Sequence, residues 1–208
     1  LAPTLSGVGD RAHLASPSID LDTHVTDIAS LLFHEDLDDV VLVGHSYGGM
    51  VITGAADRAT GRVGKLVYLD AAHPDDGQSL MDVTGGAMSG PRQQGRIVDG
   101  VELILWPSPD LVRFFGVTDP EEVAWMTERL TPHPWPCFEQ PLQMVDPERF
   151  DRIPQYHLVC TQSAGTLTNP RMEQDRAEGR YWEIDTGHDL MITEPEFVAS
   201  VLVRVAAD

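Results

Sequence analysis

An apolar run that leads directly into a Gly-x-Ser-x-Gly motif restricts the fold of this chain more than any other feature. The run covers Val40 to Val43, and the motif covers residues 44–48 with Ser46 at its centre. A serine at such a junction lies on a sharp turn between a strand and a helix, so its hydroxyl projects from the sheet. The backbone N–H of the next residue then faces the position of an oxyanion. We therefore predict Ser46 as a nucleophile and the N–H of Tyr47 as an oxyanion donor.

The glycines of the motif are expected to be required on steric grounds. A backbone at positive φ, crowded against the start of a helix, leaves little room for a Cβ, and we expect this at Gly44 and Gly48. Gly49 is expected to let the following helix lie close to its strand. Chance occurrences of this short motif lack the strand before it and the apolar residues 50–52 after it, so the context favours the functional interpretation.

Strand and helix patterns alternate on both sides of the motif. Apolar spacing predicts a helix over 22–34, and a further helix is expected from Tyr47 to about Arg58. Buried strands are predicted at 40–43, 66–69, 156–160 and 180–184, and a final helix from Pro195. Helices between short apolar strands are typical of a parallel sheet, so the fold class is α/β.

Residues 75–152 differ from the rest because they are rich in proline and glycine and show no clean strand alternation. We interpret them as a small helical cap inserted between two parts of one core, 1–74 and 153–208. Helices are predicted at 110–115 and 121–130. Cys137 is expected to be exposed in this segment, whereas Cys160 reads as a core residue. Aromatic side chains of the cap either line a substrate pocket or pack the cap: Trp106, Phe114, Phe115, Trp125 and Trp135.

The charge balance excludes several classes of partner. The chain has 208 residues and a formal net charge of −19, from 33 acidic and 14 basic residues. Such a surface repels phosphate backbones and anionic lipid, so we expect no nucleic acid and no membrane partner. A small neutral substrate fits better.

Neither a metal nor an organic cofactor is expected, because the sequence has no ligand cluster and no glycine-rich phosphate loop. Without a signal peptide the location is expected to be cytoplasmic, and the sequence does not indicate the oligomeric state.

A serine nucleophile needs a base within hydrogen-bond reach and a carboxylate that orients the base. His188 is the candidate base because it lies in a loop between the last strand and the last helix. The turn after residues 156–160 reads Thr-Gln-Ser-Ala-Gly and offers no carboxylate, so Asp70, at the end of the strand after the nucleophile's, is the candidate acid. Asp175 and Asp185 remain alternatives. His45 is expected to shape the turn or line the pocket, and His73 to line the site or serve as an ordinary loop residue.

These residues resemble the α/β-hydrolases of the branch that holds plant methyl esterases, plant hydroxynitrile lyases and bacterial esterases of the salicylate-esterase type. The likeness spans nearly the whole chain and is carried by residues 2–7, 42–49, 68–71, 76–79 and 186–189. It implies a mostly parallel sheet flanked by helices, with a small cap. In the related haloalkane dehalogenases a carboxylate at the strand end matching Asp70 serves as the triad acid.

Two departures from that family pattern stand out. Members begin with a strand that ends in His-Gly, followed by a helix, and we expect this chain to lack that N-terminal strand and helix, on the order of 30 residues. Plant hydroxynitrile lyases also have a lysine after the catalytic histidine, where this chain has Asp189. The resemblance therefore implies a serine hydrolase of small carboxylic esters. The alternatives are a lyase or cyclase that uses the same triad, and a catalytically silent binding protein.

Overall fold

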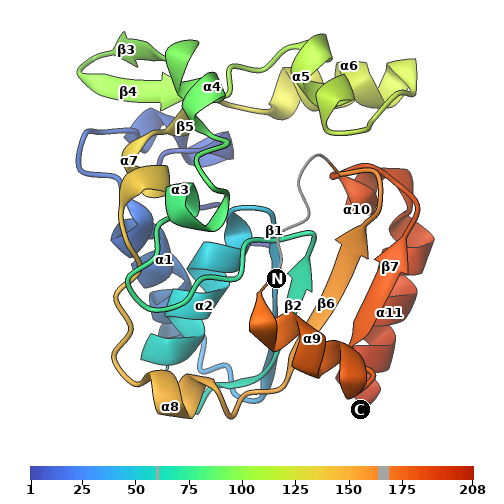
Figure 1. Ribbon diagram of the computed structural model, residues 1–208. Coiled ribbons are helices and arrows are strands. Elements are labelled where there is room, and N and C mark those ends of the chain that lie inside the picture. The colour runs from blue at the N-terminus through green and yellow to red at the C-terminus, as the bar shows by residue number, and fades with distance from the viewer. Residues whose placement is uncertain (60, 164–168) are drawn as a thin grey trace.

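The body of the molecule is a four-stranded parallel sheet (Figure 1). The computed structural model describes residues 1–59, 61–163 and 169–208. The strands are β1 (Val40–His45), β2 (Val63–Leu69), β6 (Gln155–Cys160) and β7 (Tyr181–Ile184), in the order β1-β2-β6-β7. All three pairings are parallel. The predicted α/β architecture is therefore confirmed, and the carboxyl ends of the strands meet at one edge.

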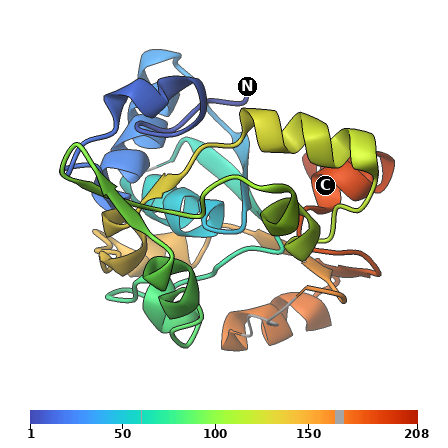
Figure 2. The same cartoon turned by 90° about the horizontal axis from the view of Figure 1, so that it is seen from above.

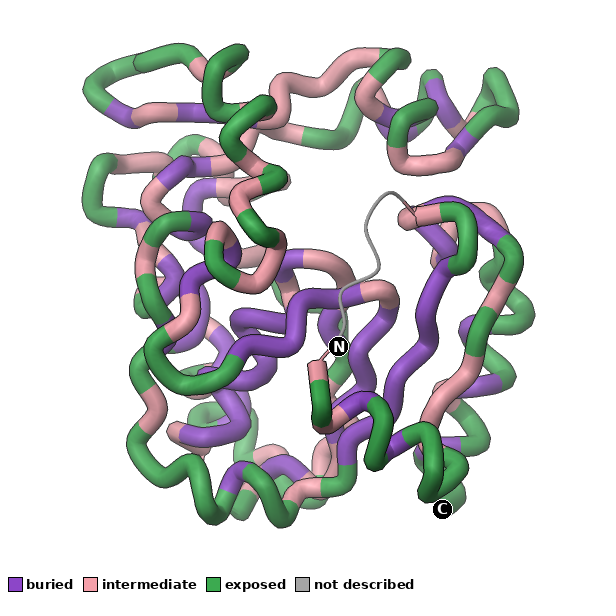
Figure 3. Tube along the Cα trace, viewed as in Figure 1, coloured by how far each residue is buried: buried purple, intermediate pink, exposed green. Residues whose placement is uncertain are grey.

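Helices cover both faces of this sheet, because the strands are apolar on both sides. Leu66 and Tyr68 of β2 pack in one core cluster with α1 (Leu21–His34) and α2 (Gly48–Arg58). The alternate residues Val67 and Leu69 pack in a second cluster with α11 (Pro195–Ala207). Figure 3 shows that the central strands β2 and β6 are mostly buried, whereas the outer strands β1 and β7 are only partly buried. The remaining body elements are the 3₁₀ helix Gly9–Leu14, α9 (Pro170–Ala177) and α10 (Leu190–Thr193).

Local sequence signals account for the start of α1. The Asp20 carboxylate accepts a hydrogen bond from the N–H of Thr23 at 2.9 Å, and Thr23 completes a capping box. The helix therefore begins at Leu21, one residue before the predicted start. Val25, Ile28 and Leu32 are buried along one face of it, as the apolar spacing predicted.

The segment predicted as a cap, residues 75–152 and called the cap below, begins with a short helix against the body and places most of its elements above the carboxyl edge of the sheet (Figures 1 and 2). Its strands β3 (Arg96–Val98), β4 (Val101–Ile104) and β5 (His133–Pro134) form an antiparallel sheet. The segment holds these short strands beside the helices that the sequence predicted, and strands of two to four residues are too short to show alternation in a sequence. Its helices are α3 (Leu80–Val83), α4 (Ser89–Gln93), α5 (Pro109–Phe114), α6 (Pro120–Arg129), α7 (Pro136–Glu139) and α8 (Pro147–Phe150).

The cap is fixed to the body by apolar contacts at two places. Val112, Val117, Val123 and Met126 of the α5–α6 region form a cluster against Ile192 of α10. Near α7, Cys137 is fully buried in the main core and its thiol lies 3.7 Å from the carbonyl oxygen of Ile19. The predicted exposure of Cys137 was wrong, because its proline-rich segment folds down onto the body. None of the helices in the described residues is long and apolar enough to cross a membrane.

Candidate active site

Ser46 lies on the sharp turn that the motif predicted. It follows β1 directly, and α2 begins two residues later at Gly48. Its backbone has φ of +54°, in the left-handed region that a non-glycine residue rarely adopts. The turn is held by its neighbours, since the Ser46 N–H donates to Leu69 O at 3.3 Å and the Ala72 N–H donates to Ser46 O at 3.0 Å. The strand after the nucleophile's therefore supports the strained residue.

The glycines around Ser46 differ in how much space their surroundings leave for a side chain. At Gly44 a Cβ would lie 2.6 Å from the carbonyl oxygen of Gly48, and at Gly49 it would overlap the carbonyl oxygen of Ala72. At Gly48, in contrast, a Cβ would meet nothing within 4 Å. The expected crowding is confirmed at Gly44 and was wrong for Gly48. The positive φ falls on Ser46 itself and not on either glycine.

Ser46, His188 and Asp70 lie within hydrogen-bond distance of one another in a chain. The Ser46 Oγ is 2.7 Å from Nε2 of His188, and Nδ1 of His188 is 2.6 Å from Oδ2 of Asp70. Because the carboxylate accepts from Nδ1–H, Nε2 is free to accept from the serine hydroxyl. This arrangement can withdraw a proton from the serine and stabilise the resulting imidazolium.

Asp70 is held on several sides. It directly follows β2 with φ of +41°, and its Oδ1 accepts a hydrogen bond from the N–H of Cys160 at 3.1 Å. Burial acts to raise the pKa of Asp70, but hydrogen bonds from His188, Ser163 and the Cys160 N–H outweigh it and hold the pKa below the ordinary value. The carboxylate is therefore ionised at neutral pH, as the support of an imidazolium requires.

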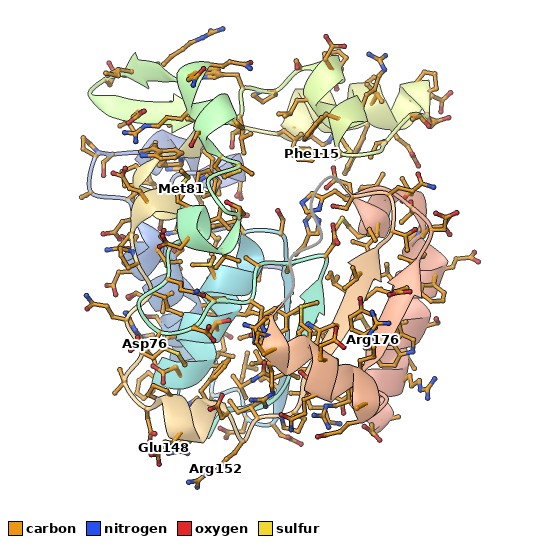
Figure 4. The ribbon with its side chains drawn as sticks, viewed as in Figure 1. Asp76, Met81, Phe115, Glu148, Arg152 and Arg176 are labelled. Atoms are coloured by element: carbon orange, nitrogen blue, oxygen red, sulfur yellow. The ribbon has the colours of Figure 1, made fainter. Side chains whose placement is uncertain are left out.

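The loop that carries His188 is fixed to the cap. The N–H of Asp189 donates to the carbonyl oxygen of Phe115 at 3.1 Å, and the Phe115 ring lies 5.3 Å from the His188 ring. Gly116 and Gly187 touch so closely that a Cβ on either would lie 2.5 Å from the Cα of the other. In Figure 4 Phe115 lies on the side of α5 that faces the body. A cap residue is thus part of the surroundings of the candidate base.

Asp189 is a second carboxylate near the same histidine. Burial raises the pKa of Asp189 to about 6, the charge of His188 opposes this shift, and the charge of Asp70 adds to it. Its Oδ1 lies 3.8 Å from Nε2 of His45. Sequence reasoning did not give Asp189 or this contact a structural role, because neighbouring residues in a loop give no signal of which way each side chain points.

The other predicted site residues lie in different surroundings. The Tyr47 N–H follows Ser46 at the start of α2, and no acceptor is paired with it among the residues that the structure describes. His45 contacts His188. His73 is buried against Tyr68 and His157, and burial, with the nearby His157, lowers its pKa to about 3.

Trp106 and Trp135, two of the three cap tryptophans named as possible pocket residues, are engaged within the cap and core. The Trp106 indole N–H donates to Leu103 O at 3.2 Å, and Arg96 stacks on its ring. Trp135 is 1% exposed in the main core, beneath the guanidinium of Arg92. Of the five cap aromatics, Phe115 is the one with a ring contact to His188 in the described part of the chain.

The alternative acids face other partners. Asp175 pairs with Nε2 of His157 at 3.1 Å and with Arg180 at 2.6 Å. Asp185 is bound by Thr161 and Gln162 at the start of the turn after β6. That turn was expected to offer no carboxylate, and its residues 164 and 165 lie outside the described residues. Within the described ranges, no group of three or more His, Cys, Asp or Glu could hold a metal ion.

Comparisons with known proteins agree with this fold. The model of the alpha/beta hydrolase family matches residues 1–201. A carbendazim hydrolyzing esterase of Nocardioides sp. (strain SG-4G) is 34% identical over 216 residues, which cover 99% of this chain and 87% of that protein. An extracellular alpha/beta-hydrolase from a Paenibacillus species has a TM-score of 0.76 at 24% identity, covering 99% of this chain and 86% of that one. The methylesterase MES16 from Arabidopsis has a TM-score of 0.68 at 20% identity, covering 98% and 84%.

The chain belongs to the alpha/beta hydrolase family. Within that family it is of the esterase type, a carboxylic ester hydrolase.

Proposed function

We propose that this protein hydrolyses small carboxylic esters through an acyl-enzyme, with Ser46 as nucleophile, His188 as base and acid, and Asp70 as the orienting carboxylate. The observation that carries the proposal is the continuous chain of short contacts, 2.7 Å from Ser46 to His188 and 2.6 Å from His188 to Asp70. Three residue types that are weak catalysts separately become effective in this order, because the base activates the hydroxyl and the acid fixes the base.

The reaction follows from these contacts. The Ser46 oxygen attacks the ester carbonyl carbon while its proton moves to Nε2 of His188. The tetrahedral intermediate collapses, and the imidazolium returns that proton to the departing alcohol. Water then attacks the acyl group, again with its proton taken by Nε2, and the carboxylic acid leaves with Ser46 restored. Throughout, Asp70 accepts from Nδ1–H and stabilises the positive imidazole.

The negative charge on the carbonyl oxygen needs a donor in each tetrahedral intermediate. The N–H of Tyr47 supports this role, because it directly follows Ser46 at the amino end of α2. A single donor of this type contributes about 3 kcal/mol to the stabilisation of the transition state.

The acidic surface favours an uncharged substrate. A formal net charge of −19 disfavours the approach of anions, whereas a neutral ester meets no such barrier. The Nocardioides relative is named for carbendazim, so that compound belongs in the substrate panel beside simple esters. The cytoplasmic location, the division at residues 75 and 152, and the absence of nucleic acid and membrane partners stay predictions.

The test is hydrolysis of short-chain p-nitrophenyl esters and carbendazim by the purified protein. Wild type is expected to turn over at least one ester, and Ser46→Ala is expected to lose about 10⁴-fold or more in kcat. Ser200→Ala is the matched control, because this exposed serine of α11 only bonds to the carbonyl of Phe197. A fluorophosphonate should label wild type at Ser46 and leave Ser46→Ala unlabelled.

The other outcomes separate the alternatives. Turnover that survives Ser46→Ala contradicts the proposal. Labelling of Ser46 without ester hydrolysis points to a lyase or cyclase that uses the same residues, and neither labelling nor turnover points to a silent binding protein.

A further inference from the structure

His188 is held at two separate points. Its ring lies between Ser46 and Asp70, and its backbone carbonyl oxygen lies 2.9 Å from Nε2 of His45. A carbonyl oxygen can only accept, so Nε2 of His45 carries the hydrogen and donates it. We infer that His45 is a positioning residue that fixes the main chain of His188 relative to Ser46. This inference rests on the proposed function of His188 as the base.

The position of His45 in the chain supports this role. It is the last residue of β1 and directly precedes Ser46, so one rigid turn carries both the nucleophile and the group that holds the base. Its ring also packs against the His188 ring, with centroids 4.5 Å apart and an angle of 44° between the planes. Asp70 orients the imidazole, whereas His45 locates the backbone from which the imidazole extends. The geometry of a base depends on both.

His45 is neutral, which suits a hydrogen-bond donor that lies beside a catalytic base. Burial, assisted by the nearby His188, lowers the pKa of His45 to about 3, against a smaller opposing effect of its hydrogen bond to the His188 carbonyl. A neutral ring places no second cation beside the imidazolium that forms on His188. The charged groups that face this pair are Asp70 on Nδ1 of His188 and Asp189, whose Oδ1 lies 3.8 Å from Nε2 of His45.

A role in lining the substrate pocket is the alternative for His45, and it has different consequences. The side chain is 25% exposed, and its Nε2 faces the backbone of His188. Loss of a pocket contact changes KM, whereas displacement of a base changes kcat. A displacement of about 1 Å in a catalytic group can cost about 100-fold in rate.

The experiment compares His45→Leu with His45→Gln in hydrolysis of the best p-nitrophenyl ester. Leucine fills similar space without a donor, and glutamine carries a donor on Nε2 at a similar reach. We expect His45→Leu to lower kcat by about 10- to 100-fold with KM within about twofold, and His45→Gln to stay within about threefold of wild type. His34→Leu, at the exposed end of α1, is the control for loss of a histidine.

A measurement on wild type keeps the inference testable even if a variant fails to fold. Nitrogen-15 NMR of the histidine rings should show His45 as the neutral Nε2–H tautomer from pH 8 down to about 4.5. The Nδ1–H tautomer, a change in KM alone, or equal loss in folded His45→Leu and His45→Gln would overturn the inference. Each of these results leaves the proposed function intact if Ser46→Ala is inactive, whereas an active Ser46→Ala defeats the proposed function itself.

Discussion

Asp70 links His188 to the sheet. Oδ2 of Asp70 lies 2.6 Å from Nδ1 of His188, and Oδ1 accepts from the N–H of Cys160 at 3.1 Å. One carboxylate at the end of β2 thus joins β6 and the loop after β7, and the candidate base depends on the alignment of three strands.

Replacement of this carboxylate should damage catalysis more than folding. Asp70→Asn is expected to lower kcat by about 10³- to 10⁴-fold, because an amide can leave the imidazole in the wrong tautomer and stabilises no imidazolium. The measurement is kcat on a p-nitrophenyl ester. Asp185→Asn is the matched control, since that carboxylate binds Thr161 and Gln162 and, among the described residues, makes no contact with His188. Equal losses in both variants would contradict the role of Asp70.

The two neighbouring glycines at the start of α2 should respond in opposite ways to alanine. Gly49→Ala is expected to destabilise the protein by about 2–3 kcal/mol or more, because the new Cβ overlaps the carbonyl oxygen of Ala72. Gly48→Ala has open space and is expected to be neutral or stabilising by up to about 1 kcal/mol. Urea unfolding of both variants measures the difference. A Gly49→Ala protein as stable as Gly48→Ala would show that α2 and the loop after β2 are not in contact there.

Three histidines with lowered pKa values predict a loss of stability in acid. Burial is the largest cause that lowers the pKa of His45, His73 and His133 to about 3 each. Between pH 6.5 and about 3 the unfolded chain therefore binds protons that the folded chain does not, and stability falls as pH falls. Each such histidine contributes up to about 1.4 kcal/mol per pH unit. Thermal unfolding between pH 7.5 and 4.5 should show this decline, and His73→Leu should make it shallower. A flat profile over that range would contradict the prediction.

The stability that Asp189 contributes should change with pH in the opposite direction. Its folded pKa of about 6 lies above the ordinary value, so its contribution to stability is complete below about pH 3.8 and is lost as pH rises through 6. Asp189→Asn removes this loss. Relative to wild type, the free energy of unfolding of the variant is expected to rise by up to about 3 kcal/mol as the pH is raised from 4 to 7.5. Urea unfolding at the two pH values measures the gain, with Asp185→Asn as the exposed control. An equal effect at both pH values would show that Asp189 titrates normally.

Much of the architecture could be predicted from local patterns. The apolar runs at 40–43, 66–69 and 156–160 correspond to strands, and the motif around Ser46 predicted the turn itself. Chain order then directed attention to Asp70 and His188, because the ends of parallel strands meet at one edge. The structure brings these two side chains and Ser46 together.

The remaining features depend on contacts that leave no trace in the sequence. The cap strands are too short to show alternation, and the burial of Cys137 depends on how a proline-rich segment folds back. The contact of His45 with His188 joins residues 143 positions apart and follows from the path of one loop. For the same reason Gly48 and Gly49 look alike in sequence, although only Gly49 faces another backbone.

The meeting of Gly116 with Gly187 restricts how the cap can open. The touching backbones prevent α5 from tilting inward, and the hydrogen bond from Asp189 N–H to Phe115 O resists an outward swing. Movement of this end of the cap must therefore break that bond or draw His188 away from Ser46. A displacement of α5 is therefore expected to disturb the loop that carries the candidate base, so this end of the cap and the site are mechanically linked.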